Sequence, residues 1–331
     1  MVEVVGIDPE GRPVHGVQIQ NGHLRANLLS FGAALQSLYL DGVVHSMVLG
    51  YESCQAYFEN PNYFGSIVGR YANRIAGATA LIEREVWKLD ANSLGKHHLH
   101  GGSKGSAFRN WAIDDHSRSH VVFSDVLPHG HMGYPGNLRV SARYEITGDG
   151  DLDIRIQAST DRPTICNFTS HSYFNLDGRP RIDRHHLQVP SHKYVATDIE
   201  GIPLVDAVRQ VPKDLDFRNL RPLADQGKII DLDSNYCLSE ARTGLQPAAK
   251  LWSPEAGVSL FLSTSEPGLQ VYTGAGLVDV DRGERPISPH AGVALEPQIW
   301  PDAPNRKNFP VAVLLPEETY QHHSNYRFAV D

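Results

Sequence analysis

Residues 138–159, LRVSARYEITGDGDLDIRIQAS, contain two stretches in which apolar and polar residues alternate. The first stretch has apolar side chains at every second position, namely Leu138, Val140, Ala142, Tyr144 and Ile146. The second stretch repeats the pattern with Leu152, Ile154, Ile156 and Ala158. Successive side chains of a β-strand point to opposite faces, so this period of two is typical of strands with one buried face. The turn residues GDGD between the stretches predict a β-hairpin.

The same alternation recurs in the second half of the chain. Residues 258–264 (VSLFLST) alternate, and residues 269–274 (LQVYTG) do so after a short break. The residues expected on one face of a final strand are Tyr320, Tyr326, Phe328 and Val330. Strands of this kind need a second layer to cover their apolar face.

A further hairpin and one short helix are expected elsewhere. Val17 and Leu24 flank Asn21-Gly22, which is a preferred two-residue hairpin turn. Helical periodicity is scarce, and residues 51–60 (YESCQAYFEN) are the best candidate for a helix.

Many short strands separated by turn residues indicate an all-β fold. We expect one large antiparallel β-sandwich with few short helices. The 331-residue chain has no linker-like stretch, so a single domain over residues 1–331 is expected.

The composition narrows the class of partner and the compartment. Lys plus Arg number 30 and Asp plus Glu number 38, a formal net charge of −8 with no block of basic residues. Nucleic acid and membrane surfaces are therefore not expected as partners. Cys54, Cys166 and Cys237 are far apart and odd in number, which excludes a complete disulfide framework. The chain lacks a signal-like start and a long apolar run, so we expect a cytoplasmic protein.

Four segments interrupt the strand pattern with polar or titratable residues. They are GRYANRIAG (69–77), HHLHGG (97–102), TSHSYFNLDG (169–178) and LEPQIWPDAPN (295–305). Each lies where a strand runs into a loop, which is where β scaffolds carry functional groups. The chain has 17 histidines, and a single histidine in a strand is more often a satisfied structural group than a catalyst. Taken alone, His171 therefore favours a structural role, and the same holds for Glu296.

The histidines His97, His98 and His100 could indicate a zinc site. Histidine is a common zinc ligand, but no HExxH or CxxC spacing accompanies these residues. We therefore expect no metal.

Taken together, the four segments resemble the galactose mutarotase (aldose 1-epimerase) family in order and separation. The resemblance also covers FGAALQSLYL, GNLRVSARYEI, DLDSNYCL, LQVYTG and NFPVAVLLPEETY, which extends it over nearly the whole chain. It implies the galactose mutarotase-like supersandwich, a large antiparallel β-sandwich, in agreement with the period of two. It also implies interconversion of the α and β anomers of aldohexoses such as galactose and glucose, with no cofactor and no metal.

The resemblance implies that Glu296 is the general base and His171 the general acid. The carboxylate would take the proton of the anomeric hydroxyl while the imidazolium protonates the ring oxygen, which opens the hemiacetal to a free aldehyde. Each charged group is expected to stabilise the other. The residues expected to bind the sugar are Asn73, Arg74, His100, Tyr173, Asp233 and Gln270.

Three departures from the family pattern bear on substrate preference. Ser170 precedes His171 where the family usually has Asn, and Pro297 follows Glu296 where Thr or Ser is more familiar. The pair His97-His98 replaces the usual polar pair ahead of LHGG. None of these changes removes an expected catalytic group.

Two other functions stay open at this point. A hexose-phosphate mutarotase would need cationic groups at the pocket rim, and the candidates are Arg179, Arg181 and Arg184. A noncatalytic carbohydrate-binding module would commonly lack the acid or the base, whereas this chain has both. The partner expected in each case is a small-molecule sugar, and both a monomer and a homodimer fit the sequence.

Overall fold

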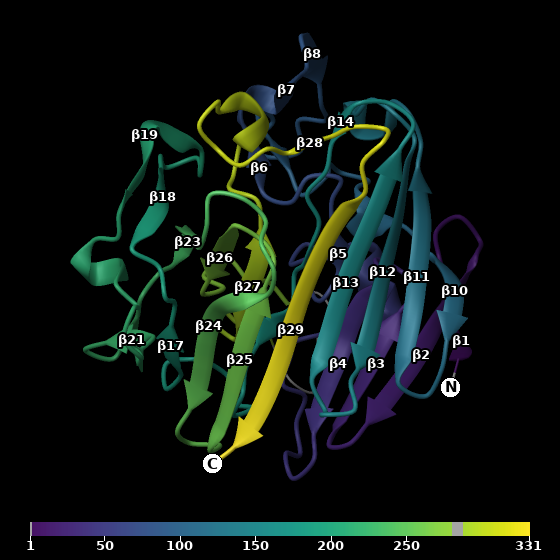
Figure 1. Ribbon diagram of the computed structural model, residues 1–331. Helices are drawn as coiled ribbons and strands as arrows, with labels where there is room; N and C mark the ends of the chain where they lie inside the picture. The colour runs from purple at the N-terminus through teal and green to yellow at the C-terminus, as the bar shows by residue number, and fades with distance from the viewer. Residues whose placement is uncertain (1, 280–286) are drawn as a thin grey trace.

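The computed structural model describes residues 2–279 and 287–331, and its large sheets are antiparallel (Figure 1). The hairpin predicted from residues 138–159 is present as β12 (Leu138–Ile146) and β13 (Leu152–Thr160). The two strands pair without a bulge from Leu138 with Thr160 to Ile146 with Leu152. This hairpin forms part of a nine-stranded sheet. The strand that follows β13 across the sheet is distant in sequence, β29 (Tyr320–Val330).

The nine-stranded sheet is the first layer of a sandwich. Across the sheet, its strands are β10 (Ala112–His116), β11 (His120–Leu127), β12, β13, β29, β25 (Val258–Thr264), β24 (Gln246–Ser253), β17 (His186–Gln188) and β20 (Arg221–Pro222).

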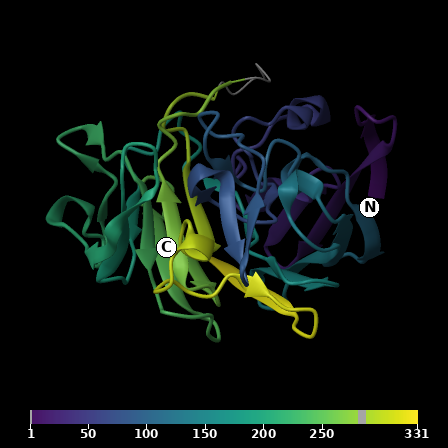
Figure 2. The ribbon, with the colours of Figure 1, turned by 90° about the horizontal axis from the view of Figure 1, so that it is seen from above.

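Two smaller sheets form the second layer, behind the long strands in Figure 1. The four-stranded sheet contains β1 (Val2–Ile7), β2 (Pro13–Asn21), β3 (Leu24–Leu29) and β4 (Ala34–Leu40). The six-stranded sheet has the order β16 (Tyr173–Phe174), β27 (Val293–Gln298), β26 (Gly268–Tyr272), β23 (Asp233–Cys237), β18 (Lys193–Thr197) and β19 (Pro203–Gln210). Figure 2 shows the N-terminal strands and the strands around β18 and β19 at opposite ends of the molecule.

One hydrophobic core joins the three sheets. Tyr144 and Ile156 of the long hairpin pack in the same cluster as Ile19 of β2 and Leu295 of β27. The Tyr144 hydroxyl donates to the carbonyl of Ala33 at 2.8 Å, which satisfies its polar end inside the core. Complete burial of an aliphatic side chain stabilises the folded state by about 1.5–3 kcal/mol, so this shared core holds the layers together. The expected all-β sandwich is confirmed.

Short ladders and 3-10 helices occupy the connections between the large sheets. The ladders are β14 (Thr164–Ile165) with β28 (Val313–Leu314), β15 (Thr169–Ser170) with β5 (Ile67–Val68), β21 (Ala224–Asp225) with β22 (Lys228–Ile229), β6 (Arg74–Ile75) with β9 (His98–Leu99), and β7 (Thr79–Ile82) with β8 (Glu85–Lys88). The 3-10 helices are η1 (Cys54–Phe58), η2 (Ala76–Ala78), η3 (Ser106–Phe108), η4 (His131–Gly133), η5 (Lys213–Leu215) and η6 (Ala303–Asn305). Within the described ranges, no helix has the length and apolar character that a membrane crossing requires.

Two local predictions are correct in kind but shifted in position. The hairpin of β2 and β3 pairs Asn21 with Leu24, so its turn is centred on Gly22 and His23 and not on Asn21-Gly22. The Asn21 amide instead donates to the carbonyls of Ile146 and Thr147 at 3.2 and 3.0 Å, a contact that local turn rules do not include. The helix expected over residues 51–60 is limited to η1.

The final strand also differs slightly from its prediction. Tyr320, Tyr326 and Phe328 are buried on one face of β29, as expected. Val330 is 60% exposed, because it lies at the end of the strand and beyond the core.

Candidate active site

The six-stranded sheet has polar side chains on the face that is turned away from the core. Gln270 of β26 lies directly opposite Glu296 of β27, so both side chains point to the same face. Leu295, one position away, points into the core. Asp233 of β23 lies opposite Tyr272 and extends the polar face to the next strand. The near-complete burial of β26 and β27 on both faces therefore has two causes, the core on one side and a polar cavity on the other.

A cavity of about 190 Å³ lies against this polar face. All of the site residues expected from the sequence line it: Asn73, Arg74, His100, His171, Tyr173, Asp233, Gln270 and Glu296. The other lining residues are Pro61, Asn62, Tyr63, Leu99, Tyr272, Gly276 and Leu277. The fold thus brings motifs from both halves of the chain to one small cavity.

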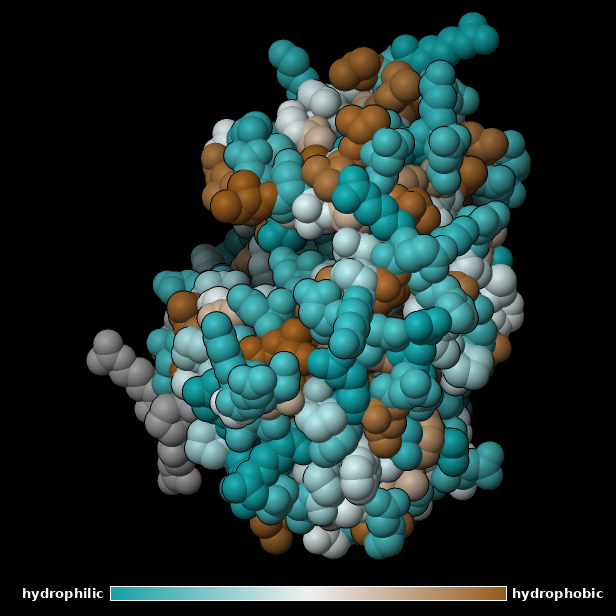
Figure 3. Space-filling view, turned by 90° about the vertical axis from the view of Figure 1, so that its left-hand side faces the viewer, coloured by the Kyte–Doolittle hydropathy of each residue, from teal (hydrophilic) through white to brown (hydrophobic). Residues whose placement is uncertain are grey.

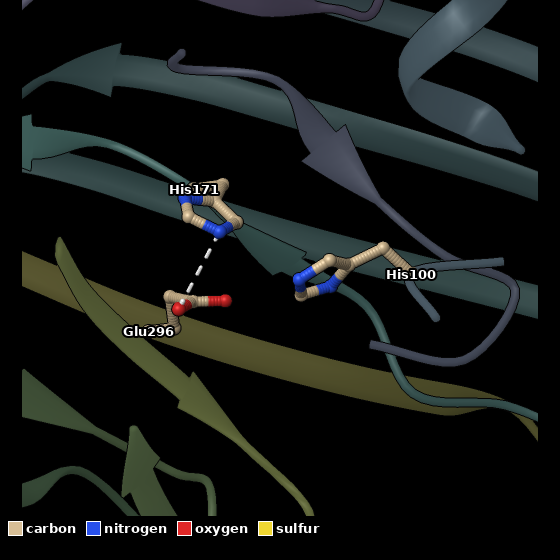
Figure 4. Close-up of side chains that lie close together, drawn as sticks. All are labelled: His100, His171 and Glu296. Atoms are coloured by element: carbon tan, nitrogen blue, oxygen red, sulfur yellow. Dashed lines mark ion pairs between the residues drawn. The ribbon is translucent and has the colours of Figure 1, made fainter. Parts of the chain in front are cut away.

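His171 and Glu296 face each other inside the cavity. Nε2 of His171 lies 3.6 Å from Oε1 of Glu296, and Figure 4 shows His100 beside the pair. The residues themselves are only 4% and 2% exposed. The backbone N–H of His171 donates to the carbonyl of Ser66 at 2.9 Å, which continues the short ladder between β15 and β5 and fixes the backbone that carries the imidazole.

Burial works against the charged form of both groups. It lowers the pKa of His171 to about 4 because the imidazolium loses its hydration. Burial also raises the pKa of Glu296 well above its ordinary value; the charge of Asp233 adds to this effect and Arg74 opposes it. We expected each charged group to stabilise the other, but loss of hydration is the larger effect at both residues. Both shifts favour the form in which the single proton of the pair lies on Glu296, and transfer of that proton to His171 gives the ionised form with the same net charge.

His100 is held as a neutral hydrogen-bond donor. Its Nδ1 accepts a hydrogen bond from the backbone N–H of Asn73 at 3.1 Å, so the ring proton of the neutral imidazole lies on Nε2. Burial is the main cause that lowers the pKa of His100 well below its ordinary value, and the neighbouring His171 and Arg74 add to the effect. The neutral ring can therefore donate to a hydroxyl oxygen in the cavity.

The same hydrogen bond tests whether the cavity suits a metal. The possible ligand atoms of His100, His171 and Glu296 lie within 4.8 Å of one another. A histidine that binds a metal normally donates its second ring N–H to an acceptor. At His100 the second ring nitrogen, Nδ1, instead accepts a hydrogen bond from the N–H of Asn73. The ring proton therefore lies on Nε2, which has no lone pair to offer a metal in the cavity. The donor set fits a polyhydroxylated ligand better than a metal ion.

The histidine run next to His100 does not form a zinc site in the described structure. Nδ1 of His97 accepts from the N–H of Gly77 at 3.0 Å, and its Nε2 faces Glu200 at 3.0 Å. His98 instead bonds the carbonyl of Asp90 through Nδ1 at 2.7 Å. The zinc interpretation is therefore not supported, because the three rings face different partners.

The remaining polar side chains at the cavity are partly paired with one another. The amide of Gln270 donates to Oδ1 of Asp233 at 2.6 Å, and Nη1 of Arg74 lies 3.6 Å from Oδ2 of the same carboxylate. Asp233 is 45% exposed and lies at the mouth of the cavity. Oε1 of Gln270, Oε2 of Glu296 and Nδ1 of His171 are buried without a hydrogen-bond partner among the described residues. Buried polar atoms rarely stay unpaired, so the two oxygens, which belong to side chains of the cavity lining, are suited to hydroxyls of a ligand.

Two aromatic residues of the cavity lining, Tyr63 and Tyr272, were not expected from the sequence, and Tyr63 is the one whose ring stacks on His171. Its ring stacks on His171 at a centroid distance of 5.8 Å and contacts His100 at 4.9 Å. Tyr173 also stacks on His171, at 5.0 Å. Burial raises the pKa of Tyr63 to about 12. Tyr63 lies in a loop with a positive φ of 57°, and no motif in the surrounding sequence marks it.

The positions that depart from the family pattern lie outside the cavity lining. Ser170 is buried, and its hydroxyl is bonded to that of Ser172 at 3.0 Å. Pro297 lies opposite Leu269 on the core side of the sheet. Their effect on the sugar is therefore indirect.

Comparison with known proteins agrees with this geometry. The sequence model of the family described as Aldose 1-epimerase matches residues 15–327. The aldose 1-epimerase of Escherichia coli K12 is 33% identical over an alignment of 345 positions, which covers 99% of this chain and 99% of that protein. Human galactose mutarotase is 32% identical over an alignment of 333 positions, which covers 97% of this chain and 95% of that protein.

A solved structure extends the similarity to the backbone. The aldose epimerase homologue from C. elegans superimposes with a TM-score of 0.88 at 29% sequence identity, covering 95% of this chain and 98% of that one. The family match and the shared fold place the chain among β-sandwich enzymes of the isomerase class. This chain belongs to the aldose 1-epimerase family, whose members act on sugars.

Proposed function

We propose that this protein is an aldose 1-epimerase, or mutarotase, that interconverts the α and β anomers of free aldohexoses such as galactose and glucose. The observation that carries the proposal is the approach of His171 Nε2 to Glu296 Oε1, 3.6 Å apart inside a cavity of hydrogen-bonding side chains. The small volume of the cavity, about 190 Å³, favours a single monosaccharide over a longer oligosaccharide.

The reaction needs one group at each of two oxygens on the same carbon. Ring opening starts from the form in which the single proton of the pair lies on His171. Glu296 takes the proton of the anomeric hydroxyl while His171 gives its proton to the ring oxygen, and the bond between the anomeric carbon and the ring oxygen breaks. The free aldehyde rotates about the adjacent carbon–carbon bond. Reclosure reverses both proton transfers and forms the other anomer. Each positioned acid or base contributes about 10²- to 10⁴-fold to such a reaction.

The other cavity residues are proposed to hold the hydroxyls of the sugar. Arg74 and His100 donate hydrogen bonds, Asp233 accepts them, and Asn73 and Gln270 can do both. These types match a hexose, whose hydroxyls each donate and accept. Tyr173 is proposed to contact the sugar beside the catalytic imidazole, on which it stacks.

This cavity is less suited to a phosphorylated sugar than to a free one. Arg179 and Arg184 pair with Glu255, at 3.1 and 2.5 Å, and neither these residues nor Arg181 line the cavity. Of the described lining residues, Arg74 is the one permanent cation, and it faces Asp233. A phosphate dianion would need more cationic partners.

Two further proposals concern the whole chain. Residues 1–331 form one domain, and support comes from the core cluster that contains residues of all three large sheets. The protein works in a reducing compartment such as the cytoplasm, and support comes from the unpaired thiols of Cys54, Cys166 and Cys237.

Polarimetry tests the proposed activity directly. Freshly dissolved α-galactose and α-glucose are expected to approach the optical rotation of the equilibrium mixture faster when the protein is added. A rate equal to the spontaneous one at micromolar protein would reject the function. Glucose 6-phosphate, measured in parallel, is expected to be a poorer substrate than glucose.

A further inference from the structure

The loop between β18 and β19 contacts the Arg74 side chain at the rim of the cavity. The loop is a tight turn built by Asp198, whose Oδ1 accepts from the N–H groups of Glu200 and Ile202 at 2.9 and 3.0 Å. Apolar packing does not hold the tip, because the side chain of Ile199 is fully exposed. The surface that carries β18 and β19 is mostly hydrophilic, with separate hydrophobic groups (Figure 3).

Gly201 lies directly against the guanidinium of Arg74. A Cβ atom added at Gly201 would lie 2.9 Å from both Cζ and Nε of Arg74 and 3.0 Å from its Cδ. The φ of Gly201 is +77°, in the left-handed region that favours glycine. This close approach of backbone to side chain therefore depends on the absence of a side chain at position 201.

Glu200 ties the loop to the segment beside Arg74. Its Oε2 lies 2.6 Å from Nζ of Lys96 and 3.0 Å from Nε2 of His97. Nδ1 of His97 accepts from the N–H of Gly77, so Nε2 carries the proton and donates to Glu200. His97 is 3% exposed and cannot move without disturbing its surroundings. It also adjoins the ladder in which Arg74 pairs with Leu99.

The backbone of Arg74 is held by other contacts. Its carbonyl accepts from the N–H of Asp302 at 2.8 Å, and its own N–H donates to Oδ1 of Asn73 at 2.8 Å. The contact with Gly201 therefore restricts the side chain, while the backbone is fixed from the opposite direction.

We propose that Gly201, held by the contacts of Glu200 with His97 and Lys96, is a positioning residue for sugar binding. It limits the Arg74 guanidinium to the orientation in which Nη1 faces Asp233 at 3.6 Å across the mouth of the cavity. An arginine that is ordered before the sugar arrives loses less conformational freedom on binding, and this strengthens affinity. The inference rests on the proposed function, because it takes Arg74 as a ligand of the sugar.

A matched pair of glycine variants tests the proposal. Gly201→Ala and Gly227→Ala both place alanine at a positive φ, +77° and +78°, but a Cβ at Gly227 meets nothing within 4 Å. Both variants are expected to lose similar thermal stability. Gly201→Ala is expected to raise KM for galactose about tenfold with kcat changed less than about twofold, whereas Gly227→Ala keeps the wild-type KM. A crystal structure of Gly201→Ala is expected to show Arg74 displaced from Asp233.

A second pair of variants tests the contacts of Glu200 with His97 and Lys96, and it does not depend on the folding of the glycine variants. Glu200→Ala is expected to raise KM about threefold to fivefold. Glu200→Gln is expected to raise it less, since the amide oxygen still accepts from His97. Glu255→Ala is the control, because Glu255 also pairs with two cationic side chains, Arg179 and Arg184, outside the cavity lining.

The outcomes separate this inference from the proposed activity. Equal KM values for Gly201→Ala and Gly227→Ala, or a wild-type KM in Glu200→Ala, would overturn it. Calorimetric titration with galactose provides a readout that needs no turnover. If the wild type binds galactose without accelerating mutarotation, the proposed activity fails, while the dissociation constants of the variants still test the role of Gly201. A wild type that neither binds nor turns over galactose rejects both.

Discussion

The backbone N–H of Asn73 donates to Nδ1 of His100 and thereby leaves the ring proton of His100 on Nε2. The bond joins two residues that both have positive φ values, 70° and 50°. Such conformations persist where surrounding contacts enforce them, and they are common at functional sites. The loop geometry at residue 73 thus determines which kind of atom His100 presents to the cavity.

Metal removal is the first consequence. Dialysis against EDTA is expected to leave the mutarotase rate unchanged, because His100 presents an N–H group and not a lone pair to the cavity. The rate is measured by polarimetry before and after dialysis. Activity that disappears and returns with added zinc would contradict this reading of the cavity.

Glu296→Gln is expected to lower kcat by about 10²- to 10⁴-fold, because the amide cannot take a proton. The affinity for galactose, measured by calorimetric titration, is expected to change much less, since the amide keeps a similar shape. Glu318→Gln is a suitable control, because Glu318 is an exposed acid outside the cavity lining. Wild-type turnover in Glu296→Gln would exclude Glu296 as the base.

The same substitution is expected to stabilise the folded protein above pH 4.5. The pKa of Glu296 is raised in the folded state, so the free energy of unfolding of the wild type falls as pH rises above the ordinary pKa of a glutamate. It goes on falling until pH passes the raised pKa of the folded state. The difference in Tm between Glu296→Gln and wild type should therefore increase from pH 4.5 upward. A difference that is constant with pH would show that the carboxyl titrates alike in the folded and unfolded chains.

The dependence of kcat/KM on pH is expected to reflect a pair that works with one proton. On the acid side, a second proton binds as pH falls toward 4, the value to which burial lowers the pKa of His171. On the alkaline side, the pair loses its only proton when pH passes the raised pKa of Glu296. Initial rates over a broad pH range measure both limbs. An acid limb near the ordinary histidine pKa of about 6.5 would contradict the effect of burial.

Tyr63 is expected to act through its ring. Tyr63→Ala removes the stacking on His171 and the ring contact with His100, and it is expected to lower kcat/KM about tenfold. Tyr63→Phe keeps the ring and is expected to stay within about twofold of wild type. Steady-state kinetics on galactose compare the two variants. A similar loss in both would assign the role to the hydroxyl instead.

Much of this fold could be predicted from local pattern. The period of two in residues 138–159 is enough to place β12 and β13, because each strand buries one face of alternating side chains. The eight expected site residues meet in one cavity because their motifs lie on strands and loops around a single sheet. The period of two could not show that the two faces of β26 are buried for different reasons. One face packs against apolar neighbours, and the other borders the cavity.

Other features depend on contacts between distant segments. The turn after β2 shifts by one residue because Asn21 bonds carbonyls of the long hairpin. Tyr63 and Gly201 reach the site from loops whose shape is set by positive φ values. Neither residue type marks a site in the linear sequence, so the three-dimensional contacts were needed to find them.

The alignment of Gln270 with Glu296 has a further consequence for misfolded forms of the chain. If β27 slid by a single residue against β26, Glu296 would enter the apolar interior and Leu295 would face the cavity. A slipped molecule would lose its solvent-shielded carboxylate and much of its apolar packing at the same time. With Glu296 as the proposed base, a molecule with slipped strands is expected to be inactive, so the specific activity of a preparation should rise with the fraction of molecules that have folded in register.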